Sequence, residues 1–148
     1  MFKHILVAVD GSHTAELALQ EAVKLASEQQ ATLRIVHAVD IVNINLGTEF
    51  PNPSEISDAM TKGGQEILRK AEATARAAGI QVKTRLIEID TLGHRIPEVI
   101  AADAEAWPAD LIVIGTHGRR GLSHLFLGSV AEGVVRVATK PVLLIRGK

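Results

Sequence analysis

Five short segments, four of them apolar runs and one alternating, divide the chain and predict five strands. They lie at residues 5–9, 33–39, 82–89, 111–114 and 142–145, and they are rich in Ile, Val and Leu. Continuous apolar runs of four to eight residues are typical of strands that are buried on both faces of a sheet. The segment at 82–89 instead alternates between apolar and polar residues, which predicts a half-exposed strand at an edge of the sheet.

Residues with helical spacing fill the intervals between these segments. Small apolar residues recur every three or four positions after Ser12, which is a suitable N-cap. Two later stripes, over 96–100 and 130–137, predict further helices, and the last of them must end before Pro141. Strands that alternate with helices in this order form a parallel sheet with helices on both faces. The pattern is that of an α/β protein.

The helical stripe before the third strand contains two adjacent glycines. Gly63 and Gly64 each cost about 1 kcal/mol relative to alanine inside a helix, so we predict that this helix begins near Gln65 and ends at Gly79. The segment at 40–53 precedes it and carries Asn, Gly and Pro residues, which predicts a long loop after the second strand. A loop of this length is commonly a binding loop or a lid, and a tolerated surface excursion is the alternative.

Composition then limits the classes of function. The 148 residues fit a single domain, 1–148, and 47% of them are hydrophobic, which is enough for one core. A net charge of −1 and the scarcity of aromatic residues argue against a nucleic-acid-binding protein. Without cysteine the chain forms no disulfide, thiolate metal site or cysteine nucleophile. Its apolar runs are shorter than the ~20 residues of a membrane span, and its first residues are not typical of a signal peptide, so we expect a cytoplasmic protein.

Chemistry is expected at the ends of the strands. Ligands of an open parallel sheet bind beyond the carboxyl ends of its strands, where this chain has Asp10, Asp40 and the glycine-rich segment 115–121. Successive backbone amides in a glycine-rich turn bind anions. Gly128 and Ser129 then open the last helix, where free N–H groups and the helix dipole favour phosphate. We therefore predict a phosphate site, and a turn that only joins strand to helix is the alternative.

Four features together resemble one known family. Residues 5–12 form a strand that ends in Asp-Gly-Ser, 109–118 hold a strand followed by Gly-Thr-His-Gly, and 140–145 hold the last strand. The spacing Gly-x2-Gly-x9-Gly-Ser begins at Gly115. This motif resembles the nucleotide motif in the ATP-binding branch of the universal stress protein family, and the three strands resemble that family's first, fourth and last strands. The resemblance covers essentially the whole chain.

The resemblance implies a Rossmann-like sheet of five parallel strands in the order 3-2-1-4-5. It also implies that the protein binds ATP, with Mg²⁺ or Mn²⁺ as the metal ion. Asp10 would contact the ribose or the metal, although a carboxylate that only caps its own turn is the alternative, and the backbone of Ala38 would meet the adenine. The implied site consists of Ala8, Val9, Asp10 and Ala38 at the adenosine end, and of Gly115, Thr116, His117, Gly118, Arg119, Arg120, Gly121, Gly128, Ser129 and Val130 at the phosphates.

The expected function is that of a dimeric, nucleotide-responsive binding protein in stress adaptation. One alternative is a nucleotide-free scaffold of the same fold that acts through protein contacts, and another is a slow ATPase. The sequence has no Gly-x4-Gly-Lys-Ser/Thr loop and no Gly-x-Ser-x-Gly elbow, so binding is better supported than hydrolysis. Its six histidines show no metal-binding spacing, so a structural zinc is not expected.

The last strand suggests how the chain would dimerise. Residues 142–145 would lie at an edge of the sheet, yet they contain no charged residue and no bulge signal. Apolar edge strands normally need to be covered. We predict a homodimer in which two copies of this strand meet about a two-fold axis, and cover by the short tail at 146–148 is the alternative.

Overall fold

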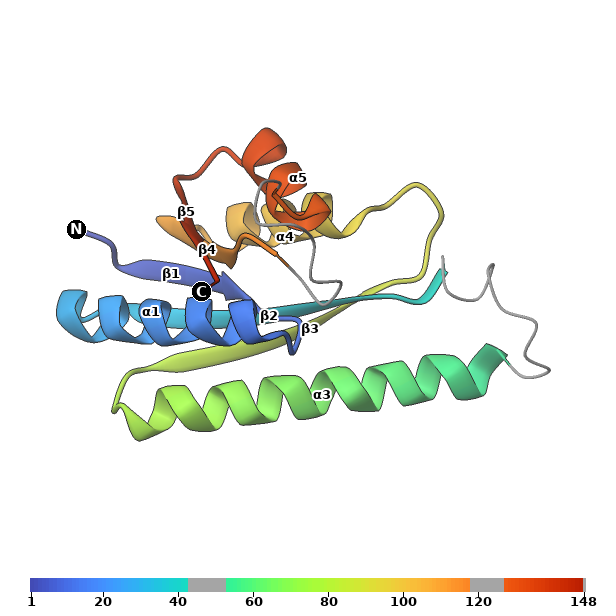
Figure 1. The fold of residues 1–148 in the computed structure, drawn as a ribbon, viewed down its shortest axis with the longest axis horizontal. Helices are drawn as coiled ribbons and strands as arrows, with labels where there is room; N and C mark the ends of the chain where they lie inside the picture. The colour runs from blue at the N-terminus through green and yellow to red at the C-terminus, as the bar shows by residue number, and fades with distance from the viewer. Residues whose placement is uncertain (43–52, 118–126, 148) are drawn as a thin grey trace.

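The computed structural model describes residues 1–42, 53–117 and 127–147 and contains one parallel sheet (Figure 1). The strands stand in the order β3-β2-β1-β4-β5, so the predicted fold class and strand order are confirmed. The strands are β1 (His4–Ala8), β2 (Thr32–Asp40), β3 (Val82–Ile89), β4 (Leu111–Gly115) and β5 (Val142–Ile145). The helices are α1 (His13–Gln29), α3 (Pro53–Ala77), α4 (Ile96–Ala106) and α5 (Ser129–Val137).

Helices cover both faces of the sheet, α1 and α3 on one side and α4 and α5 on the other (Figure 1). Successive residues of β1 serve the two cores, since Ile5 and Val7 pack toward α1 and α3 while Leu6 packs toward α4 and α5. All three side chains are fully buried. Because β1 and β4 are buried on both faces, their sequences read as almost continuous apolar runs. The predicted edge position of β3 is confirmed, and its residues are exposed or partly buried except Ile89, without a regular alternation.

The prediction that the helix before β3 begins near Gln65 is wrong, because α3 begins at Pro53 and runs through both glycines. A Cβ atom on Gly64 would lie 2.7 Å from Cδ2 of His37 and 2.8 Å from Cδ1 of Leu86, so glycine is required for α3 to pack this closely on β2 and β3. Gly63 faces open space. Packing of the helix on the sheet therefore outweighs the low intrinsic helix propensity of the two glycines.

Two other glycines allow close packing near the carboxyl ends of the strands. A Cβ on Gly115 would lie 2.8 Å from Cγ2 of Thr14, where β4 passes the first turn of α1. A Cβ on Gly133 would lie 2.5 Å from Cγ of Pro97, where α5 crosses the start of α4. The sequence thus brings the beginnings of three helices close to the strand ends.

A buried ion pair holds α4 against the sheet. The carboxylate of Asp103 on α4 accepts hydrogen bonds from Nε and Nη2 of Arg34 on β2, at 2.8 and 3.0 Å. It also accepts one from Nη1 of Arg85 on β3, at 2.8 Å. The side chain of Asp103 is 2% exposed and that of Arg34 is 14% exposed. The Arg34 guanidinium lies 5.7 Å from the ring centroid of Trp107, which adds a cation–π contact.

A second carboxylate joins the first residues of the chain to the start of β4. Asp110 accepts hydrogen bonds from the backbone N–H groups of Lys3 and His4, at 2.8 and 2.9 Å. These two bonds favour the charged form and lower the pKa of the Asp110 carboxyl. The contact lies at the amino ends of β1 and β4. It therefore stabilises the end of the sheet opposite to the predicted site.

Candidate functional site

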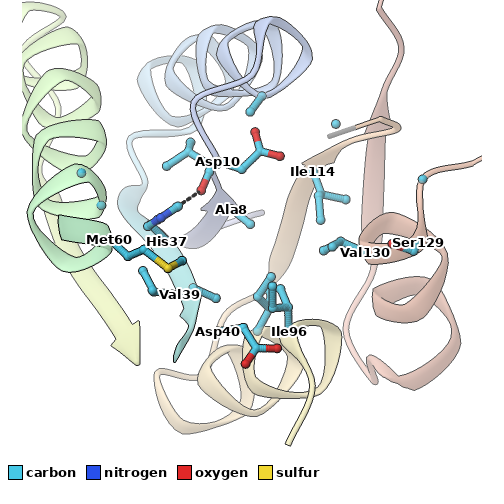
Figure 2. A pocket seen from close by; sticks show the side chains of 18 of the residues that line it. Ala8, Asp10, His37, Val39, Asp40, Met60, Ile96, Ile114, Ser129 and Val130 are labelled. Atoms are coloured by element: carbon cyan, nitrogen blue, oxygen red, sulfur yellow. Dashed lines mark hydrogen bonds between the residues drawn. The ribbon is translucent and has the colours of Figure 1, made fainter. Parts of the chain in front are cut away.

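A cavity of about 1020 Å³ opens at the carboxyl ends of β1, β2 and β4. Figure 2 shows Met60 and His37 on one side of it and Val130 on the opposite side. Its volume is at the upper end of the range of small-molecule and cofactor sites, about 300–1,000 Å³. Every predicted site residue within the described part of the chain lines this cavity, namely Ala8, Val9, Asp10, Ala38, Gly115, Thr116, His117, Gly128, Ser129 and Val130. The other predicted residues, Gly118, Arg119, Arg120 and Gly121, lie outside the described residues.

Asp10 stands at the turn between β1 and α1. Its Oδ1 accepts a hydrogen bond from the N–H of Ser12 at 2.9 Å, and the Oγ of Ser12 accepts one from the N–H of Ala15 at 3.1 Å. Ser12 is therefore the N-cap of α1, as predicted. Asp10 stabilises its own turn and also lines the cavity (Figure 2). Its position therefore agrees both with a carboxylate that caps its own turn and with one that contacts a ligand.

Thr116 joins the end of β4 to the start of α5. Its N–H donates to the carbonyl of Ile145 at 2.9 Å, and its own carbonyl accepts from the N–H of Gly128 at 2.6 Å. Its hydroxyl lies 3.0 Å from Nδ1 of His117. Thr116 as a whole is 6% exposed. These bonds hold the beginning of α5 beside the end of β4.

The first turn of α5 borders the cavity at this end. Gly128 is the N-cap of the helix and has no side chain with which to cap the amides that follow. Ser129 and Val130 line the cavity, so the positive end of the helix dipole lies at its wall. In α1, by contrast, the side chain of Ser12 caps the first turn. Like the start of α4, which also lacks a side-chain cap and borders the cavity, the start of α5 presents backbone N–H groups that suit an anion.

The apolar wall of the cavity was not predicted from the sequence. Met60 comes from α3, Ile96 and Ile100 come from α4, and Ile114 comes from β4. In the sequence these residues have only the helical or strand spacing of ordinary core positions. They become cavity residues because the fold brings α3, α4 and the end of β4 together around the same space. His37, which is 8% exposed and also lines the cavity, was missed for the same reason.

The donor set at Asp10 decides what kind of metal ion the site would accept. Within residues 1–42, 53–117 and 127–147, no three His, Asp or Glu side chains are grouped closely enough to hold a metal ion. Asp10 borders the cavity together with the hydroxyl-bearing residues Thr116 and Ser129. Mg²⁺ is usually held by one or two carboxylates together with substrate phosphates and water. The residues therefore fit a Mg²⁺ that arrives with phosphates.

Comparison with known proteins identifies the family. The model of the universal stress protein family matches residues 1–146. The chain belongs to the universal stress protein family. The universal stress protein YxiE of Bacillus subtilis is 37% identical over 153 residues, which cover 99% of this chain and all of the relative. A crystal structure of a family member from Burkholderia pseudomallei is 35% identical, with a TM-score of 0.79 over 97% of this chain and 96% of the other.

Two further solved members of the family are complexes with adenine nucleotides. One is the complex of a universal stress protein with cAMP. That protein is 26% identical to this chain, with a TM-score of 0.68 over 98% of this chain and 97% of the other. The other, from Archaeoglobus fulgidus, holds dAMP and is 29% identical, with a TM-score of 0.67 over 97% and 98%. Some structural relatives of this chain thus bind adenine nucleotides. None of its described helices is long and apolar enough to cross a membrane.

Proposed function

We propose that this universal stress protein binds ATP, or another adenine nucleotide, in the cavity at the carboxyl ends of β1, β2 and β4. In this proposal it acts as a nucleotide-responsive binding protein in stress adaptation. The observation that carries the proposal is the position of Gly128 and Ser129 at the uncapped start of α5, on the same cavity as Asp10. A helix start of this kind binds phosphate groups through its backbone amides and its dipole.

The opposite part of the cavity supports the adenosine half of the ligand. Val39, Met60 and Ile96 supply apolar surface for a flat base, and the backbone of Ala38 supplies polar groups at its edge. Asp10 lies between this part and the phosphate end, where a ribose hydroxyl or a Mg²⁺ would meet its carboxylate. An apolar cavity with a few convergent polar groups is typical of a nucleotide site.

At the phosphate end the proposal includes residues 115–121 together with Gly128, Ser129 and Val130. Mg²⁺ or Mn²⁺, when bound, would neutralise part of the phosphate charge, and Asp10 would be its protein ligand. The residues supply backbone amides and hydroxyls, which bind and orient phosphates. The sequence has no P-loop lysine, so the proposal is binding, with slow hydrolysis of ATP as its furthest extent.

The first test is to purify the protein without added nucleotide, denature it and identify any nucleotide that is released. A thermal melt of nucleotide-free protein should accompany it. A ligand at 100 times its Kd adds about 2.7 kcal/mol to the free energy of unfolding, which corresponds to a rise of roughly 5–11 °C in Tm for a chain of this size. Release of no nucleotide, together with an unchanged Tm in ATP and Mg²⁺, would favour the nucleotide-free scaffold instead.

We also propose that the protein is a homodimer that meets through β5. Leu143 on this edge strand is 39% exposed, and Val135 and Val137 at the end of α5 are 47% and 42% exposed. Apolar side chains at an open strand edge form a surface on which another strand can pair. In a dimer with a two-fold axis, each copy would cover this surface of the other.

Light scattering at micromolar concentration should give twice the chain mass of 15.8 kDa. Leu143→Lys should halve that mass because it places a charge on the edge. Leu92→Lys is the matched control, since Leu92 is 69% exposed elsewhere on the surface, and it should leave the mass unchanged. A monomer mass for the parent protein would contradict the proposal.

A further inference from the structure

The hydrogen bonds between β1 and β2 change partner where the cavity begins. The strand register ends at the pair Ala8 and Val36, and one more bond runs from the N–H of Val9 to the carbonyl of Val36, at 2.9 Å. In a regular parallel ladder the next bond would join the N–H of Ala38 to the carbonyl of Val9. That carbonyl instead accepts a hydrogen bond from the imidazole of His37, with 2.7 Å between Nδ1 and O (Figure 2).

The imidazole of His37 is held in this position from two sides. A carbonyl oxygen only accepts hydrogen bonds, so Nδ1 of the ring carries the proton. On the other side Cδ2 of the ring lies beneath Gly64 of α3, where a Cβ would approach it to 2.7 Å. The ring is therefore fixed between the end of β1 and the closest approach of α3.

The consequence concerns the peptide groups of Ala38. Alternate residues of a strand direct both their N–H and C=O groups to the same neighbour, so those of Ala38 point to the same side as those of Val36, toward β1. At this level the strand β1 has ended, and Ala38 lines the cavity. One donor and one acceptor therefore face the cavity side by side. This pair is complementary to the N1 acceptor and the N6 amino donor of adenine.

We propose that His37 is a positioning residue: by holding the Val9 carbonyl toward its imidazole, it keeps the peptide edge of Ala38 open to read the base of the nucleotide. This inference rests on the proposed function, because it assigns the adenine edge to the same cavity. A carbonyl can accept two hydrogen bonds, so the imidazole acts by holding the Val9 carbonyl toward itself. Without the imidazole donor, we expect this carbonyl to turn to the Ala38 N–H, extend the ladder by one bond and remove the donor that faces the base.

Three substitutions of His37 distinguish the effect of its hydrogen-bond donor from the effect of the volume of its ring. His37→Asn retains an N–H group near the position of Nδ1, whereas His37→Gln moves the amide one bond further out and His37→Leu has no donor. The parent should bind ATP at least tenfold more tightly than ITP, whose base reverses donor and acceptor at positions 1 and 6. We expect His37→Leu and His37→Gln to lose about tenfold in ATP affinity and most of this preference. His37→Asn should keep the ATP-to-ITP ratio within about threefold of the parent.

Backbone amide exchange in the nucleotide-free protein tests the same geometry without any ligand. The amide of Ala38 should exchange faster than that of Val36 in the parent and become protected in His37→Leu. An equally slow Ala38 amide in the parent, or an unchanged ATP-to-ITP ratio in both His37→Leu and His37→Gln, would overturn the role of His37. A parent that binds neither ATP nor ITP would overturn the proposed function, and the exchange data would still decide whether His37 keeps the Ala38 edge open.

Discussion

Replacing Asp103 with alanine is expected to lower the free energy of unfolding by about 3–5 kcal/mol. The carboxylate is 2% exposed, and it receives two hydrogen bonds from Arg34, which is itself 14% exposed. Its removal leaves the largely buried guanidinium of Arg34 without its main counter-charge, which costs more than the lost bonds alone. For a chain of this size the change corresponds to a fall of roughly 6–20 °C in Tm.

Two controls assign the effect to the buried charge. Arg85→Ala removes the third member of the group, but Arg85 is 52% exposed and water can replace its contact, so we expect a loss below about 1 kcal/mol. The double variant Arg34→Met with Asp103→Leu removes both buried charges and should recover most of the stability. Chemical denaturation monitored by circular dichroism measures all four proteins. A free energy of unfolding for Asp103→Ala within 1 kcal/mol of the parent would contradict this prediction.

Replacing Gly128 with valine is expected to weaken ATP binding at least 100-fold while the fold is retained. The backbone of Gly128 has φ −63° and ψ 156°, which valine adopts without strain. The hydrogen bond from its N–H to the carbonyl of Thr116 is also available to valine. The branched side chain would occupy space at the start of α5 where the phosphates are proposed to bind.

Thermal melts with and without ATP and Mg²⁺ measure this effect. At an ATP concentration of 100 times the parent Kd, the stabilisation should fall from about 2.7 to about 0.4 kcal/mol. Ala106→Val is a matched control, because Ala106 is exposed at the end of α4 and does not line the cavity, and it should keep the full shift. If ATP protects Gly128→Val as well as it protects the parent, the phosphates are bound elsewhere.

The candidate site could be predicted from the sequence wherever its residues belong to a local motif. Gly115 and Gly128 stand out because their positions at a strand end and at a helix start, and the spacing between them, are visible in the sequence itself. Met60 and His37 carry no such signal, since their role depends on where α3 lies on the sheet. The same holds for Asp103, whose spacing in α4 does not reveal that Arg34 lies opposite.

The sequence by itself determined the α/β class, the limits of most elements and the edge character of the strand at 82–89, because these depend on hydrophobic period and on turn and cap residues. Tertiary structure alone decided where α3 begins, since the packing of Gly64 against β2 and β3 outweighs local propensity. It also decided that the carbonyl of Val9 meets His37 rather than Ala38. A hydrogen bond of this kind depends on the relative placement of two strands and a helix, which no local pattern encodes.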